Sequence, residues 1–139
     1  MNLKIYRNEA SPGCELRDDF RTVCVNRSKG TLYFNKKAML DFGLSTENRV
    51  VVAQDEDSRN DWYLCFTGPD DKAGARLRKE HKRCERSSIK AHMLKAARAI
   101  LDSAKVTNSA TFIIAASPTI TPDGTEWYRI LTANPIMTR

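Results

Sequence analysis

The chain has 139 residues, of which 41% are hydrophobic and 29% charged, and its formal net charge at pH 7 is +6. These proportions are typical of a soluble globular protein, and the length is sufficient for a core that needs no disulfides. The sequence has no run of about 20 apolar residues, which a membrane-spanning helix needs. Residues 1–7 carry charges where a signal peptide would have its apolar region, so we expect a cytoplasmic protein.

The first half of the chain predicts strands, one short helix and then a further hairpin. Asn35 is a suitable N-cap for the helix at residues 36–42, because its side chain can accept hydrogen bonds from free helical amides. Gly43 is expected to end that helix in the left-handed conformation. The strands, indicated by β-branched and aromatic residues between turn signals, are expected at residues 3–6, 21–26, 31–34, 49–55 and 62–66.

The second half repeats this order. A basic hairpin is expected from residues 75–79 and 83–89, turning through residues 80–82. A helix over about residues 91–102 follows, because apolar residues from Ile89 to Ala104 recur at the helical period. Strands at residues 110–116 and 126–131 complete the half. We expect six residues on the apolar phases of these segments to be largely buried: Val51, Leu64, Met93, Ile100, Phe112 and Ile114.

The repeated order predicts an internal duplication. Each half ends in an acid-Trp-Tyr sequence, first at Asp61-Trp62-Tyr63 and again at Glu126-Trp127-Tyr128. We therefore predict one α+β domain over residues 1–139, with a mostly antiparallel sheet, two helices and two pseudo-repeats at about residues 20–67 and 74–132. The two helices should be equivalent, and Trp62 should match Trp127. Neighbours on a strand face opposite sides, so one aromatic of each pair can be core while the other faces outward. The outward one, beside basic residues, either stacks on a base or simply covers the sheet.

The positive charge is concentrated in one segment. Residues 74–98 hold nine basic and two acidic residues, a net charge of +7, so the rest of the chain is close to neutral. Such clustering is typical of a surface that binds a polyanion, although basic residues also protect an edge strand from aggregation. The candidate phosphate-binding residues in this segment are Arg76, Arg78, Lys79, Lys82, Arg83, Arg86 and Lys90.

A family resemblance covers residues 30–57. Residues 30–44 read Gly-Thr-Leu-Tyr-Phe-Asn-Lys-Lys-Ala-Met-Leu-Asp-Phe-Gly-Leu, and residues 48–52 read Asn-Arg-Val-Val-Val. This stretch resembles the swapped-hairpin DNA-binding domains of the AbrB/MazE/SpoVT type, in which a strand, a short helix and a polar turn lead into a hairpin. Asn35 stands where that family usually has proline, and Glu47-Asn48 replaces its Gly-Asp turn. The resemblance implies DNA contacts from Arg21, Arg27 and Lys29 on the first hairpin.

Catalytic and metal-binding motifs are not evident in the sequence. The cysteines lie far apart without a C-x-x-C pair, and we expect them to be reduced. His81 and His92 are eleven residues apart with no second acid or cysteine at ligand spacing, and the acidic residues 55–57 suit a solvated turn better than a calcium loop. We expect no cofactor and no enzymatic activity.

These observations favour a non-enzymatic protein that binds nucleic acid, DNA or RNA, through phosphate contacts. The duplicated arrangement of strands and helix is similar in architecture to the Whirly/PC4 single-stranded-DNA-binding proteins. The alternative is a protein–protein interaction or assembly module, in which the sheet forms an oligomer edge and the basic hairpin contacts an acidic partner. A homo-oligomer is compatible with both.

Overall fold

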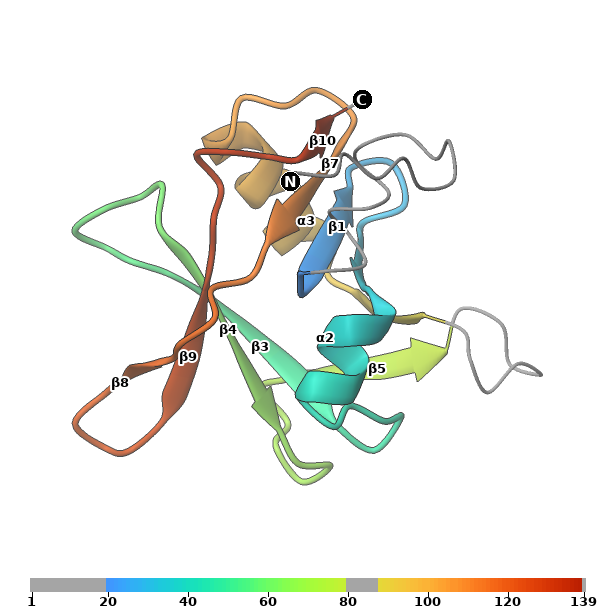
Figure 1. The fold of residues 1–139 in the computed structure, drawn as a ribbon, viewed down its shortest axis with the longest axis vertical. Coiled ribbons are helices and arrows are strands. Elements are labelled where there is room, and N and C mark those ends of the chain that lie inside the picture. Colours follow the sequence, from blue (N-terminus) through green and yellow to red (C-terminus); the bar gives the residue numbers. More distant parts are fainter. Residues whose placement is uncertain (1–19, 80–87, 139) are drawn as a thin grey trace, which may run out of the picture.

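A computed structural model describes residues 20–79 and 88–138 (Figure 1). The strand expected at residues 3–6 lies outside these residues. The two helices of the described part are α2, Lys36–Asp41, and α3, Leu94–Ser103. Its strands are β1 Thr22–Asn26, β2 Thr31–Phe34, β3 Arg49–Gln54, β4 Trp62–Thr67, β5 Ala75–Lys79, β6 Ile89–His92, β7 Ser109–Ile113, β8 Thr119–Ile120, β9 Glu126–Ile130 and β10 Met137–Thr138.

These strands form one sheet in the order β10-β7-β1-β2-β6-β5-β3-β4-β9-β8, and every pairing in it is antiparallel. The sheet curls, and strands far apart in that order meet at their C-terminal ends. Ile114, just after β7, bridges to Ile130 of β9, and the Leu131 amide donates to the Ile113 carbonyl at 2.9 Å. The expected α+β class with a mostly antiparallel sheet and two helices is therefore confirmed.

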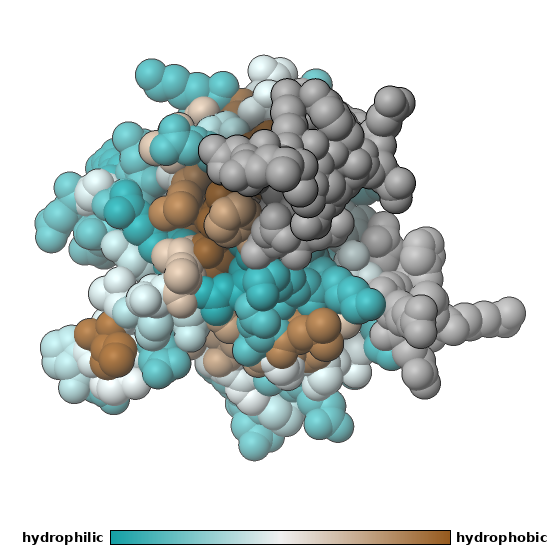
Figure 2. Space-filling view, viewed as in Figure 1, coloured by the Kyte–Doolittle hydropathy of each residue, from teal (hydrophilic) through white to brown (hydrophobic). Residues whose placement is uncertain are grey.

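The core fills the inside of this curl. Strand residues from both halves, including Phe34, Leu64 and Phe112, are completely buried, as are Ile100 and Leu101 of α3. α3 packs on β1 and β2, behind β7 in the view of Figure 1. Most of the surface in that view is hydrophilic, with apolar patches over α2 and on the β8–β9 hairpin (Figure 2). Leu40 and Ile120, on these two elements, are more than half exposed.

The ends of α2 follow the sequence expectation. The Asn35 side chain accepts a hydrogen bond from the Ala38 amide at 2.9 Å, so it caps the helix as predicted. Gly43 has a φ of 62°, and the Leu44 amide donates to the Met39 carbonyl, which closes the helix. Gly30 also has a positive φ, and a Cβ there would lie 2.7 Å from Leu94 Cδ1. This close approach fixes the β1–β2 turn against the start of α3.

The boundary between the basic hairpin and the second helix differs from the prediction. Ile89, expected on the apolar stripe of the helix, begins strand β6, and α3 starts only at Leu94. Ile89 and Ala91 are buried because alternate residues of β6 face the core. Their agreement with the apolar phase of the helix is a coincidence. The other predicted strand residues, 83–87, lie outside the described residues.

Two of the six expected core residues are only half-buried. Leu64, Ile100, Phe112 and Ile114 are buried as expected. Val51 is half-buried, because its neighbour Val50 takes the inward position on β3. Met93, the N-cap residue of α3, is also half-buried, but it packs against the core.

The two tryptophans do not match one another. Trp62 pairs with Ile130 across β4 and β9, and both are buried on the inner face. Tyr128 of β9 pairs with buried Leu64, so its side chain also lies on the inner face. Trp127 therefore faces outward, away from the inner face on which Trp62 lies, so the two tryptophans do not take the matching positions that were predicted.

Candidate nucleic-acid interface

The basic residues of β5 and β6 gather on the outer face of the sheet. Leu77 is completely buried, so Arg76 and Arg78, its neighbours on β5, point to the opposite side and are exposed. On β6 the same alternation places Lys90 outward, between buried Ile89 and Ala91. Three of the predicted residues thus share one face.

These residues are opposed by other basic residues. Arg78 is the direct cross-strand partner of Lys90, and Arg76 is the partner of Arg49 on β3. Arg49 is held by backbone carbonyls, with Nε 3.1 Å from the Pro69 oxygen and Nη1 3.2 Å from the Gly74 oxygen. Like charges directly opposite one another destabilise a sheet, so this face carries an electrostatic cost.

No described carboxylate forms an ion pair with a basic residue of β5 or β6. Within residues 20–79 and 88–138, the three ion pairs are Arg27–Asp102, Lys37–Asp41 and Arg129–Asp61, and none of them lies on β5 or β6. An open groove of about 490 Å³ runs along β5 beside Thr46. Its lining includes the four residues Arg76, Leu77, Arg78 and Lys79.

Of the remaining predicted residues of the segment, Lys79 is the one that the structure describes. Lys79 pairs with buried Ile89, so it stands at the end of β5 on the inner side and not on the outer face. Lys82, Arg83 and Arg86 lie outside the described residues.

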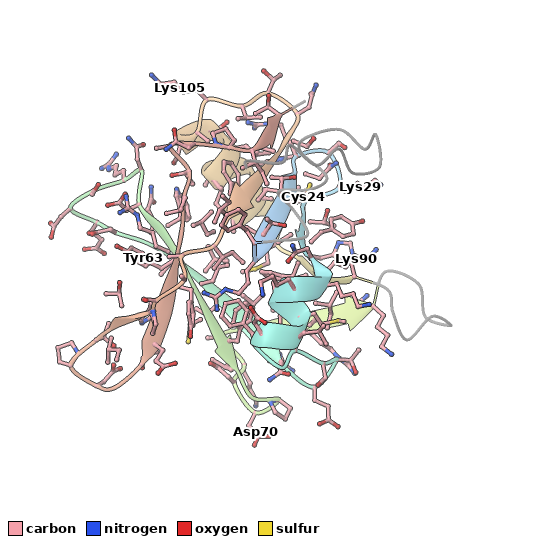
Figure 3. The ribbon with its side chains drawn as sticks, viewed as in Figure 1. Cys24, Lys29, Tyr63, Asp70, Lys90 and Lys105 are labelled. Atoms are coloured by element: carbon pink, nitrogen blue, oxygen red, sulfur yellow. The ribbon has the colours of Figure 1, made fainter. Side chains whose placement is uncertain are left out.

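An aromatic residue that the sequence analysis did not select joins the outer face. Tyr33 of β2 pairs with Lys90 on one side and with Cys24 of β1 on the other. The Lys90 Nζ lies 5.6 Å from the centroid of the Tyr33 ring, within the range of a cation–π interaction. Figure 3 shows Lys90 and Cys24 on one side of the molecule and Tyr63 toward the other. The sequence did hold a signal for the outward position of Tyr33. Its neighbours Leu32 and Phe34 are apolar, and alternation along a strand places Tyr33 on the face opposite to theirs.

The arginines predicted on the first hairpin are engaged within the protein. Arg27 donates from Nε to the Thr107 carbonyl at 2.7 Å and from Nη2 to Asp102 at 2.5 Å and to the Val106 carbonyl. Its side chain therefore ties the β1–β2 turn to the end of α3.

Arg21 is engaged in a different way. Its Nη2 donates to the carbonyls of Ala115 and Ala116, both at 2.7 Å. The guanidinium carbon also lies 4.5 Å from the centroid of the Phe42 ring and 5.3 Å from that of Tyr128. Of the three residues that the resemblance singles out, Lys29 alone is exposed without such contacts.

The predicted aromatic pairs serve the interior more than the surface. Trp62 is buried, and its indole Nε1 donates to the Ser103 hydroxyl at 3.0 Å, at the end of α3. Tyr128 packs edge-on against Phe42, 4.6 Å between ring centroids, and Phe42 also contacts Phe66. Trp62 is therefore not available for an external base, whereas Tyr128 is only half-buried.

A second open cleft, of about 530 Å³, lies between α2, β4 and β9. Its lining combines the aromatic rings of Phe42, Phe66 and Tyr128 with the acids Asp41 and Glu126. Cys65 is also in this lining, and burial raises the pKa of its thiol, with further contributions from Asp71, Asp123 and Glu126. The cleft is acidic where the β5–β6 face is basic.

The described residues provide neither a metal-binding cluster nor a membrane-spanning helix. No three of their His, Cys, Asp and Glu side chains are placed to hold a metal ion together, and Cys24 and Cys65 are free thiols. None of their helices has the length and apolarity needed to cross a bilayer.

Comparison with models of protein families, with curated proteins and with solved structures finds no match to this chain.

Proposed function

We propose that this protein is a non-enzymatic nucleic-acid-binding protein, and that the outer face of β5 and β6 binds the phosphate backbone. The contact residues are Arg76, Arg78 and Lys90, and the groove along β5 gives the backbone a place to lie. Phosphates are spaced regularly along a nucleic acid, so a row of cations on neighbouring strands suits them.

The observation that carries this proposal is the pairing of cation with cation. Arg78 opposite Lys90 and Arg76 opposite Arg49 repel one another, and the described residues supply no carboxylate to relieve them. A bound polyanion would relieve both repulsions at once. By contrast, Arg27 and Arg129 each form an ion pair with a carboxylate.

We also propose that the chain is a duplication, with halves near residues 20–67 and 74–132 related by an approximate two-fold axis. The pairings support this if β1, β2, β3 and β4 correspond to β5, β6, β7 and β9. Under that correspondence the β1–β2 pairing is equivalent to β5–β6, and the β1–β7 pairing is equivalent to β5–β3. The β2–β6 and β4–β9 pairings each join a strand to its own counterpart, so they lie on the axis. The bridge between the ends of β7 and β9 then matches β3–β4.

Two reciprocal contacts add support. Trp62 of β4 bonds to Ser103 at the end of α3, and Tyr128 of β9 packs on Phe42 at the end of α2. Each half thus contacts the helix of the other through an inward aromatic of its last strand. The order of β1, β2, α2, β3 and β4 also agrees with the hairpin–helix–hairpin order that the AbrB-type resemblance implies.

The test is a fluorescence-anisotropy titration of labelled single-stranded and duplex oligonucleotides at two salt concentrations. The wild type should bind at low salt. The triple variant R76A/R78A/K90A should bind more weakly, and its log–log salt slope should be smaller by about 0.7 per lost contact on a single strand and about 0.9 on a duplex.

The matched control is K36A/R59A/K72A, which removes the same charge from exposed positions outside β5 and β6. It should retain the wild-type slope. A control that loses as much as the triple variant would show that net charge, and not this face, causes binding. A wild type that binds no oligonucleotide at low salt would contradict the proposal and favour the protein-interaction alternative.

A further inference from the structure

We propose that the ligand of the basic face is unpaired nucleic acid, with one base stacked on Tyr33 and its flanking phosphates held by Lys90 and Arg78. This inference rests on the nucleic-acid binding proposed above, and it adds which form of nucleic acid is bound and which residue recognises it.

Tyr33 has the placement that a stacking residue needs. Its neighbours on β2, Leu32 and Phe34, are both completely buried, so the Tyr33 side chain lies on the outer face. It is only half-buried, and its hydroxyl forms no hydrogen bond with any described residue. The ring therefore serves neither the core nor a polar network of the described part.

The cations lie in register with this ring. Tyr33, Lys90 and Arg78 are direct cross-strand neighbours on β2, β6 and β5. Adjacent strands are about 4.8 Å apart, so the row from Tyr33 to Arg78 extends about 10 Å across the sheet. The Lys90 Nζ, 5.6 Å from the ring centroid, is close enough to contact the phosphate of a nucleotide whose base lies on the ring.

A base inside a duplex cannot use this ring, because both of its faces are already covered by neighbouring bases. An aromatic side chain on a sheet surface is suited to bases that are splayed out of a helix, and it accepts any of the four because each has a π-face. The arrangement therefore favours single strands over duplexes and predicts little sequence preference.

The first experiment compares Y33L with Y33F by fluorescence anisotropy, using a labelled oligothymidylate strand and a hairpin duplex of similar length. The leucine variant should bind the single strand about 5- to 150-fold more weakly, which corresponds to the loss of one base–aromatic stack, with an unchanged salt slope. The phenylalanine variant keeps the ring and should bind within about twofold of the wild type.

A second variant reports stacking directly and does not depend on a loss of binding. Y33W in a W127F background places a tryptophan at the proposed stack, and its emission should be quenched by the single strand far more than that of W127F alone. Far-UV circular dichroism and the urea midpoint check that each variant is folded.

The outcomes separate the two proposals. Failure of the wild type to bind either oligonucleotide overturns both. Salt-dependent binding that R76A/R78A/K90A weakens and Y33L does not overturns the stacking inference alone. Tighter binding of the wild type to the duplex than to the single strand also overturns it, as does quenching in Y33W/W127F that is no greater than in W127F alone.

Discussion

The β1–β2 pair and the β5–β6 pair both carry basic residues, but their charges are used differently. Arg21 and Arg27, at the ends of β1, are each held by backbone carbonyls and by either aromatic rings or a carboxylate. Arg76, Arg78 and Lys90 have no described acidic partner, and two of the resulting cross-strand pairs are repulsive.

The difference shows that clustered positive charge in a sequence has two structural meanings. An arginine that satisfies several distant carbonyls contributes to the stability of the fold, whereas one that faces another cation contributes, under the proposed function, to the affinity for an anion. Substitutions in the β1–β2 pair should therefore change the free energy of unfolding, whereas substitutions in the β5–β6 pair should change oligonucleotide binding.

The largest loss of stability is expected for Arg21→Ala. This change removes two 2.7 Å hydrogen bonds to carbonyls and the contacts of the guanidinium with Phe42 and Tyr128. We expect the free energy of unfolding to fall by about 2–4 kcal/mol, measured by urea denaturation. Arg21→Lys should lose most of the same energy, because an ammonium cannot reproduce the fork geometry. An unchanged urea midpoint would show that Arg21 is free for an external ligand.

A smaller loss, about 1–2 kcal/mol, is expected for Arg27→Ala, because its contacts with the Thr107 and Val106 carbonyls disappear. The ion pair with Asp102 contributes little of this, since the Asp102 side chain is 68% exposed. Asp102→Ala is therefore the matched control and should cost less than half as much. Equal losses in the two variants would assign the effect to the ion pair instead of the carbonyl contacts.

The smallest change in stability, and one of opposite sign, is expected for Arg78→Glu. A glutamate opposite Lys90 replaces a repulsive cross-strand pair with an attractive one, so the protein should gain about 0.2–1 kcal/mol. The same substitution should weaken oligonucleotide binding more than Arg78→Gln, which removes the repulsion without adding an acid. A glutamate variant less stable than the glutamine variant would contradict the electrostatic argument for this face.

Local signals in the sequence predicted much of the first half. Asn35, Gly43 and the alternation of β2 are short-range features, and the structure has the cap, the left-handed glycine and the strand where they were expected. The start of α3 was missed because Met93, its N-cap residue, offers no capping side-chain bond, while Ile89 fits a helical period as well as a strand.

The site was predictable only in part. Clustering of charge identified Arg76, Arg78 and Lys90, which the fold brings together on one face. The family resemblance singled out Arg21 and Arg27, whose partners in residues 102–116 are distant in the sequence and leave no mark near either arginine. Tyr33 was missed because its significance depends on the β2–β6 register, which no local pattern specifies.

The position of β1 in the sheet has a consequence for synthesis of the chain on the ribosome. β1 lies between β2, its neighbour in sequence, and β7, which pairs Ile113 with Thr22. Until β7 emerges, β1 has one free edge, and so has β4, whose second neighbour is β9. Such late, long-range closure is slow and leaves edges exposed to other nascent chains. We therefore expect the sheet to close only after β9 has emerged from the ribosome.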